Sequence, residues 1–286
     1  MASLSRYTES NSMFLTVGAA LAQGVKLLED AGVSVPRLTA EVLLSHAIGC
    51  GRTWLIAHSA DELKEVWWIH YGRYLHQRMQ GKPTQYITRV QEFYGREFRV
   101  TPAVLIPRPE TEHLIEAALP LANGKTLDIG TGSGAIAVTL ALETQATVSA
   151  TDLSGAALAV AHENSQRHKA SVQFIQADLA APFRDGSFDL VVSNPPYVPE
   201  ADRATLEREV RDHEPSLALF AGPEGLDVYR RLVPEAARGL RPRGWLVMEL
   251  GHTSAGAVRQ MLEGWSHVEI RPDLAGIPRV VLAQRP

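Results

Sequence analysis

The sequence predicts an α/β protein, in which a doubly wound, mainly parallel sheet follows a small helical bundle. From residue 125 onward, short apolar segments alternate with helical segments, which is typical of parallel strands joined by crossover helices. Ahead of residue 83, apolar residues recur at helical spacing. A chain of 286 residues is long enough for two domains of ordinary size. We therefore expect a helical domain over 1–82, a hairpin linker over 83–107 and the α/β domain over 108–286.

The N-terminal part contains three candidate helices. Segments 14–28 and 38–48 show helical periodicity, the first more weakly than the second. Ser59 and Glu62 have the spacing of a capping box, and the apolar periodicity that follows them ends before Gly81. Several amphipathic helices within about 80 residues indicate a small bundle.

The linker segment has a different character. Residues 93–100 are aromatic and alternate around Gly95, which indicates a β-hairpin. Pro107 and Pro109 lie too close together for the interior of a strand or helix, so a helix is expected to begin after Pro109.

The C-terminal part has the alternation that defines the sheet. Apolar strands are expected at 126–129, 146–151, 172–176, 188–193, 245–249 and 280–283. Helices are expected between most of them, at 135–142, 154–168, 227–240 and 254–263.

Composition restricts the class of protein and its compartment. Hydrophobic residues make up 45% and charged residues 21%, so the chain can bury a full core. One cysteine, Cys50, excludes an internal disulfide, and the histidines have no metal-ligand spacing, so no metal is expected. Residues 1–10 are polar, and no apolar run approaches the ~18 residues that span a bilayer. We expect a cytoplasmic protein without a membrane segment.

The charge balance argues against stable nucleic-acid binding. The 28 Lys and Arg residues against 32 Asp and Glu residues give a net charge of −4. Neither the first 82 residues nor the remainder has the basic surplus that duplex DNA binders usually show.

The first loop with chemical character follows the first predicted strand of the sheet. Gly130, Gly132 and Gly134 allow a tight turn and a close approach of the backbone to a ligand. Asp152 ends the next strand, where a carboxylate can accept hydrogen bonds from both ribose hydroxyls of an adenosine moiety. The spacing also satisfies a relaxed dinucleotide fingerprint. Asp128, two residues ahead of the first glycine, favours a ligand with a cationic end, such as S-adenosylmethionine.

The second such loop, Asn194-Pro195-Pro196-Tyr197, follows the strand expected at 188–193. Ligands of open α/β sheets bind beyond the carboxyl ends of the strands, so both loops should reach one site. The side-chain oxygen of Asn194 and the carbonyl of Pro195 can each accept one hydrogen from a planar NH2 group, while the Tyr197 ring can lie against its face. A primary amide and an exocyclic amine both have this shape.

Together, these loops resemble class I methyltransferases that modify planar nitrogens. Further motifs resemble the peptide chain release factor glutamine methyltransferases (the HemK/PrmC family), from about Leu38 to Leu262. They are Tyr86-Ile87, Glu92-Phe93-Tyr94-Gly95, Ile106-Pro107-Arg108-Pro109-Glu110-Thr111-Glu112 and Glu214-Pro215. Two positions depart from the family pattern: Arg89 stands where glycine is expected, and Ser254 stands where glutamine is expected.

The resemblance implies a seven-stranded catalytic domain, a helical domain that docks release factors, and methylation of the glutamine in their Gly-Gly-Gln loop. It also implies roles for individual residues. S-adenosylmethionine would be bound by Asp128, Gly130, Thr131, Gly132, Ser133, Gly134, Asp152, Asp178, Leu179 and Asn194. The target glutamine would be bound by Asn194, Pro195, Pro196 and Tyr197, which are also the catalytic candidates, and by Arg108.

Two other functions stay open on the residues alone. An adenine N6-methyltransferase acting on DNA or RNA would meet the same planar NH2 geometry, but usually needs a basic region to reach the base. A dinucleotide-dependent oxidoreductase, or a nucleotide-binding regulatory module, would use the glycine loop but would not explain Asn194-Pro195-Pro196-Tyr197.

Overall fold

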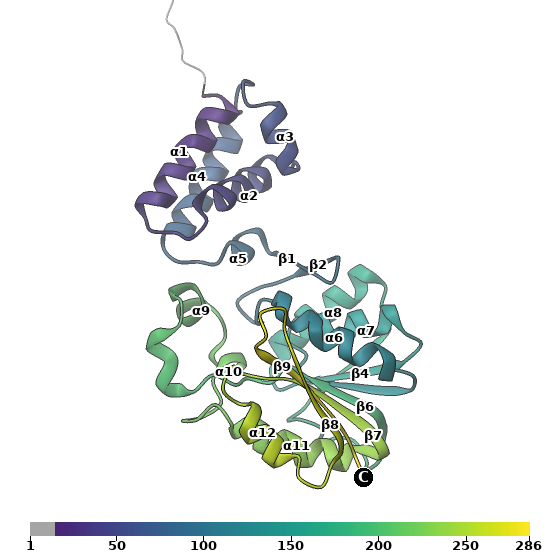
Figure 1. Cartoon of the computed structure of the whole chain (residues 1–286). Helices are drawn as coiled ribbons and strands as arrows, with labels where there is room; N and C mark the ends of the chain where they lie inside the picture. Colours follow the sequence, from purple (N-terminus) through teal and green to yellow (C-terminus); the bar gives the residue numbers. More distant parts are fainter. Residues whose placement is uncertain (1–14) are drawn as a thin grey trace, which may run out of the picture. The chain divides into compact units, whose positions relative to one another are not determined.

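A computed structural model describes residues 15–286 of the chain. Its contacts divide the chain into two compact units, Met1–Thr88 and Arg89–Pro286, so the boundary falls inside the segment predicted as a linker (Figure 1). The polar segment 1–10 and residue 14, where the first predicted helix begins, lie outside the described residues. Within residues 15–286, no helix has both the length and the apolar character that a membrane crossing requires.

The first unit is helical, as its periodicity predicts. Its helices are α1 (Val17–Asp30), α2 (Pro36–Ile48), α3 (Arg52–Ala57), α4 (Glu65–Met79) and α5 (Thr84–Thr88). Thr16 caps α1 by accepting a hydrogen bond from the Ala19 amide at 3.2 Å. Tyr71 is fully buried in the core, and Gly24 leaves room for it, because a Cβ at residue 24 would lie 1.9 Å from the tyrosine oxygen.

The predicted capping box is wrong. α4 begins at Glu65, and Lys64 stands at its N-cap. The segment ahead of it pairs instead with the chain just before and at the start of α1: Gly18 donates to the Ser59 carbonyl at 2.8 Å, and Leu63 donates to the Leu15 carbonyl at 2.8 Å. This pairing holds Ser59 away from the start of α4, although its spacing to Glu62 fits the motif.

The second unit opens with the expected hairpin, formed by β1 (Val90–Phe93) and β2 (Arg96–Arg99). Tyr94 and Gly95 form its turn with φ of 50° and 69°. Arg89, just ahead of β1, has a φ of 64°, the left-handed region that glycine occupies without strain. The glycine that the family pattern has at this position therefore has a conformational reason.

A seven-stranded sheet forms the centre of the second unit, in the order β5-β4-β3-β6-β7-β9-β8. The strands from β5 to β7 are parallel, and β9 is antiparallel to both of its neighbours. Their bounds are β3 (Lys125–Ile129), β4 (Thr147–Asp152), β5 (Val172–Gln176), β6 (Phe188–Ser193), β7 (Leu240–Glu249), β8 (Ser266–Pro272) and β9 (Pro278–Gln284). The order reverses direction between β3 and β6, so the carboxyl ends of these two strands flank the crevice in which such sheets bind ligands.

Helices cover both faces of the sheet (Figure 1). On one face, α6 (Glu112–Ala118) and α7 (Ala135–Glu143) share a core with the hairpin aromatics Phe93 and Phe98. On the other face, α11 (Asp227–Gly239) and α12 (Ala255–Met261) pack against alternate residues of the same strands. The remaining helices of this unit are α8 (Gly155–His168), α9 (Arg208–His213) and α10 (Ser216–Leu219), with short 3-10 turns at Pro109–Thr111, Leu119–Leu121 and Glu200–Thr205.

Candidate active site

A cavity of about 370 Å³ lies at the carboxyl ends of β3, β4, β5 and β6, within the second unit. Both loops singled out in the sequence line it, the glycine loop through residues 130–133 and the second loop through residues 194–196. The fold thus brings together two segments about 60 residues apart in the chain. A volume of this size suits a small-molecule ligand.

The glycine loop has the backbone conformation that glycine favours. Gly130, Gly132 and Gly134 have φ of 75°, 55° and 80°. A Cβ on either of the first two would meet nothing within 4 Å, whereas one on Gly134 would lie 3.0 Å from the Cβ of Ala161 in α8. Gly130 and Gly132 therefore leave open space beside the backbone, and Gly134 allows close packing of the helix behind it.

Asp128 does not line the cavity, so in this structure it would not be in direct contact with a ligand bound there. It is fully buried, and one carboxylate oxygen accepts a hydrogen bond from the Thr131 hydroxyl at 2.6 Å. The other oxygen has no partner among the described residues. Burial raises the pKa of Asp128 to about 7, and the nearby Asp152 carboxylate also raises it.

Asp152 ends β4 and lines the cavity, as predicted from its position. Its two carboxylate oxygens accept hydrogen bonds from the amides of Gly132 and Ser154, each at 2.8 Å. A carboxylate has about four lone-pair sites, so two remain. Two hydroxyl donors on a ligand would occupy them.

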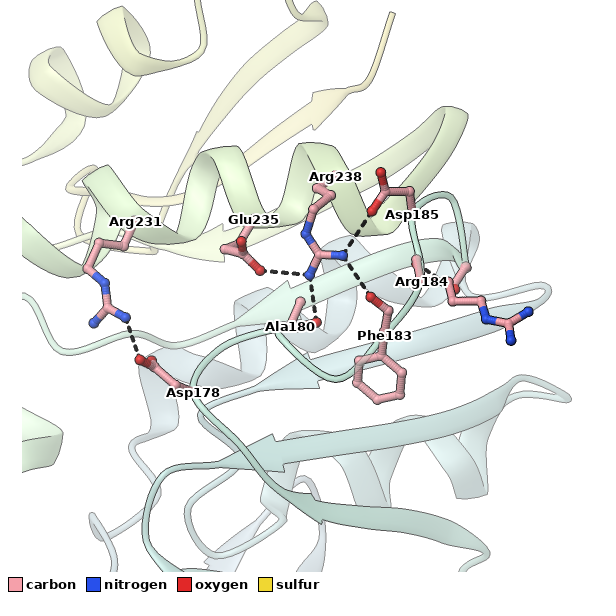
Figure 2. Close-up of polar contacts among 9 residues, drawn as sticks. Asp178, Ala180, Phe183, Arg184, Asp185, Arg231, Glu235 and Arg238 are labelled. Atoms are coloured by element: carbon pink, nitrogen blue, oxygen red, sulfur yellow. Dashed lines mark hydrogen bonds and ion pairs between the residues drawn. The ribbon is translucent and has the colours of Figure 1, made fainter.

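The loop after β5 brings Asp178 and Leu179 to the cavity wall. Asp178 forms an ion pair with Arg231 of α11 at 2.6 Å (Figure 2), and Leu179 has a left-handed φ of 53°. Arg238, two turns further along α11, donates to the carbonyls of Ala180 at 2.8 Å and Phe183 at 2.7 Å (Figure 2). This guanidinium also binds Asp185 and Glu235. One helix thus fixes the loop at several points.

The second loop begins where β6 ends. The Ser193 hydroxyl donates to the Ile129 carbonyl at 2.7 Å, which ties this loop to the strand that carries the glycine loop. The side-chain nitrogen of Asn194 donates to the Thr111 hydroxyl at 3.1 Å. Its side-chain oxygen accepts no hydrogen bond from any described residue, so that oxygen is available to a ligand.

Tyr197 is placed differently from its neighbours in the loop. It is not among the residues that line the cavity, and its ring packs against Gly251, where a Cβ would lie 2.9 Å from the ring. Its hydroxyl donates to Glu249 at 3.2 Å, and burial raises its pKa. In this structure the ring anchors the loop, and the predicted stacking on the target group would require it to move.

Glu249, at the end of β7, is buried beside the second loop. Its carboxylate accepts hydrogen bonds from the Thr111 hydroxyl at 2.6 Å and from Tyr197. Burial raises the pKa of Glu249, while these two hydrogen bonds and the charge of Arg279 oppose that rise. In the sequence this residue is only the last one of the strand expected at 245–249.

Arg108 lines the cavity and forms an ion pair with Glu214, whose side chain is 1% exposed, at 2.5 Å. Glu214 also accepts a hydrogen bond from the Ile106 amide at 3.4 Å, and burial raises its pKa. The pair links the proline-rich segment to the chain that follows the second loop. Both members of the pair belong to motifs singled out in the sequence, Arg108 to the segment 106–112 and Glu214 to Glu214-Pro215.

Sequence reasoning missed Thr111 and Glu249 as parts of the site. In the sequence, Thr111 stands out only as part of the proline-rich motif at 106–112, and Glu249 only as the last residue of an expected strand. A polar residue at the carboxyl end of a strand beside the switch point is the signal that could have identified Glu249. Within residues 15–286 there is no cluster of three or more His, Cys, Asp or Glu side chains suited to a metal ion.

Comparison with known proteins supports a single family. Residues 19–88 match the family described as "PrmC N-terminal domain", and residues 109–212 match "Methyltransferase small domain". The "Release factor glutamine methyltransferase" of Koribacter versatilis is 45% identical over 278 residues, covering 95% of this chain and 99% of the relative. The protein of the same name from Moorella thermoacetica is 43% identical over 281 residues, with the same coverage.

Solved structures support the fold. A methyltransferase from Pyrococcus furiosus aligns with a TM-score of 0.51 at 19% identity, covering 68% of this chain and 90% of that one. At this identity the likeness concerns the fold alone, and it agrees with the seven-stranded sheet described above.

Proposed function

The chain belongs to the release factor glutamine methyltransferase family, and from this premise and the geometry of the cavity we propose how it acts. It transfers a methyl group from S-adenosylmethionine to the side-chain amide nitrogen of the glutamine in the Gly-Gly-Gln loop of peptide chain release factors. The observation that supports this most is that the glycine loop and Asn194-Pro195-Pro196 line one cavity.

The residues of the cavity fit S-adenosylmethionine. The open space beside Gly130 and Gly132 admits a ligand against the backbone, and the free lone pairs of Asp152 match two ribose hydroxyls. Asp178 and Leu179 would lie beside the adenine. Buried Asp128 is hydrogen-bonded to Thr131 of the glycine loop, and its carboxylate, when ionised, would favour a cationic ligand end. When bound, S-adenosylmethionine supplies a methyl group activated by its positively charged sulfur.

The task of the protein is to orient a weak nucleophile. The lone pair of an amide nitrogen is delocalised into the carbonyl, so its direction relative to the methyl group matters greatly. The Asn194 side-chain oxygen and the Pro195 carbonyl would each accept one hydrogen of the glutamine NH2 group. Such positioning can lower a barrier by up to about 7–11 kcal/mol. The two acceptors also favour the positive charge that develops on nitrogen in the transition state.

We assign no general base. The described residues that line the cavity include the carboxylates Asp152 and Asp178 and no histidine. Both are engaged, the first with backbone amides and the second with Arg231. The proton lost from the methylated nitrogen would pass to water.

The helical unit would dock the release factor. Because release factors act in translation, we place the reaction in the cytoplasm.

Methyl transfer from labelled S-adenosylmethionine tests the function. The chain is incubated separately with a release factor, with the same factor carrying a Gln→Asn change in its Gly-Gly-Gln loop, and with duplex DNA, and products are mapped by mass spectrometry. Label on the glutamine of the unmodified factor alone is the expected result. Label on adenine, and none on protein, would replace the proposal by the adenine N6-methyltransferase alternative.

A further inference from the structure

The amide of Asn194 has two possible orientations, and only one serves the reaction. Its oxygen must face the target group to accept a hydrogen bond, so its nitrogen must point the other way. In the structure the nitrogen donates to the Thr111 hydroxyl at 3.1 Å, and the oxygen is left without a described partner. What fixes this orientation is therefore relevant to catalysis.

The single hydrogen of the Thr111 hydroxyl determines which atom of the Asn194 amide can face it. That hydrogen is donated to Glu249 at 2.6 Å, so toward Asn194 the hydroxyl oxygen acts as the acceptor. An ionised carboxylate only accepts hydrogen bonds, so Glu249 cannot reverse this direction. A flipped amide would place the Asn194 oxygen against the Thr111 oxygen with no hydrogen between them.

Glu249 is itself held rigidly. The residue is 1% exposed, and its second carboxylate oxygen accepts a hydrogen bond from Tyr197 at 3.2 Å. Its backbone carbonyl accepts one from the buried Tyr229 hydroxyl at 2.8 Å. The same carboxylate thus contacts the second loop directly at Tyr197 and, through Thr111, at Asn194.

We propose that Glu249, acting through Thr111, is a positioning residue that fixes the orientation of the Asn194 amide, so that its oxygen faces the target NH2 group. This inference rests on the proposed function and assigns residues that neither loop contains. Thr111 and Glu249 carry no role in the chemistry beyond holding this geometry.

The test replaces the Thr111 hydroxyl and compares kcat with cofactor affinity. Thr111→Val should lower kcat at saturating substrates by roughly 10- to 100-fold, because the acceptor is no longer oriented. The Kd of S-adenosylmethionine should change by less than about twofold, since no cofactor contact is removed. Thr111→Ser, which keeps the hydroxyl, should restore kcat to within about threefold of the original chain.

Thr126→Val is the matched control. Thr126 is a fully buried threonine of β3 whose hydroxyl has no described partner, and it does not line the cavity. The same chemical change there should leave kcat unaltered. Equal losses in both valine variants, or failure of the serine variant to restore activity, would overturn the proposal.

A second readout does not depend on turnover. In the chain without added cofactor, the side-chain NH2 of Asn194, followed by NMR, should exchange its protons with solvent at least about fivefold faster in Thr111→Val than in the original chain. Unchanged exchange would contradict the hydrogen bond.

Glu249 should also give a pH signature. Protonation lets its carboxyl group donate toward Thr111, which frees the threonine hydrogen to turn to the Asn194 oxygen. The groups around this carboxyl are Tyr197 and Thr111, which donate to it, the charged Arg279 and Glu110, and Tyr229, which donates to the backbone carbonyl of the same residue. kcat should fall on the acid side in the original chain, and this decline should be absent from Glu249→Gln. A decline that persists unchanged in this variant would contradict the role of Glu249. If the original chain failed to methylate the glutamine at all, the proposed function would fail instead.

Discussion

Asn194 depends on residues from three separate segments. The strand ahead of it is tied to Ile129 through Ser193, its side chain is bound by Thr111, and Thr111 is bound by Glu249. None of these contacts is local in the sequence. The loop motif therefore identifies the reacting segment, while its orientation comes from the tertiary structure.

Asn194→Ala tests the role of the amide directly. Removing an acceptor that acts chiefly in the transition state should lower kcat by roughly 10²- to 10³-fold. The Kd of S-adenosylmethionine, measured by calorimetry, should stay within about threefold, because the glycine loop and Asp152 are untouched. A variant that turns over at the original rate would disprove the role assigned to this residue.

Asp128 gives stability an unusual pH dependence. Its pKa in the folded chain is raised from 3.8 to about 7. Between these values the folded chain binds more protons than the unfolded chain, so the contribution of this group to the free energy of unfolding falls as the pH rises. The expected slope is about 1.4 kcal/mol per pH unit across that window, and above it the contribution is constant.

Asp128→Asn should remove this slope. In urea titrations without ligand, the variant should gain stability relative to the original chain between pH 4.5 and pH 8. Asp61→Asn is the control, because it makes the same chemical change at an exposed residue, and its stability is measured over the same pH range. If the free energy of unfolding of Asp128→Asn relative to the original chain did not change between pH 4.5 and pH 8, the buried carboxylate would be ionised without cost.

At this scale the sequence identified the residues of the two loops, but it did not determine which of their side chains line the cavity. Gly130, Asp152 and Asn194 line the cavity as expected, because their positions at the carboxyl ends of strands place them at this edge of the sheet. Asp128 and Tyr197 do not, since each is held by a partner hydroxyl or carboxylate that no local pattern reveals. Orientation of a side chain is a property of its neighbours in space.

At the scale of elements, α11 determines the geometry of the loop after β5. Figure 2 shows Arg238 between the loop carbonyls and two carboxylates, with Arg184 directed away from this network. Leu179, in the same loop, has a left-handed φ that is unfavourable for a non-glycine residue. The guanidinium therefore stabilises a backbone that would otherwise relax.

Arg238→Ala should loosen this loop and weaken cofactor binding. Two carbonyls and two carboxylates lose a donor, so the Kd of S-adenosylmethionine should rise by roughly 5- to 20-fold and the Tm should fall by about 2–4 °C. Arg184→Ala, in the same loop, removes a side chain with no described partner and should change neither quantity. Equal effects of both variants would indicate a general charge effect in place of loop anchoring.

The elements themselves were predictable where burial determined them. The strands at 126–129 and 188–193 have apolar, largely buried runs and were predicted close to their observed bounds. β8 was missed because it is an edge strand with mostly exposed residues, so its sequence has no apolar run. The capping box predicted at Ser59 is wrong for a different reason. The local spacing fits the motif, but this segment pairs with the chain at the start of α1.

At the scale of the whole molecule, the cavity belongs to one unit. Every residue that lines it lies between Phe93 and Leu232. The two hydrophobic cores of the second unit contain only residues from Phe93 onward, and the core of the first unit extends no further than Ile87. Among the described residues, the cores are separate, so cofactor binding and substrate docking should be separable as well.

A chain reduced to residues 89–286 tests this separation. Because it keeps the complete cavity, it should bind S-adenosylmethionine with a Kd within about twofold of the full chain. If the helical unit docks the release factor, the KM for that factor should rise by at least about tenfold, which corresponds to a loss of about 1.4 kcal/mol. kcat at saturating factor should stay within about threefold, since the positioning groups are all retained. A KM equal to that of the full chain would assign docking to the second unit, whereas a lost kcat with unchanged cofactor binding would mean that the helical unit contributes to the reacting geometry itself.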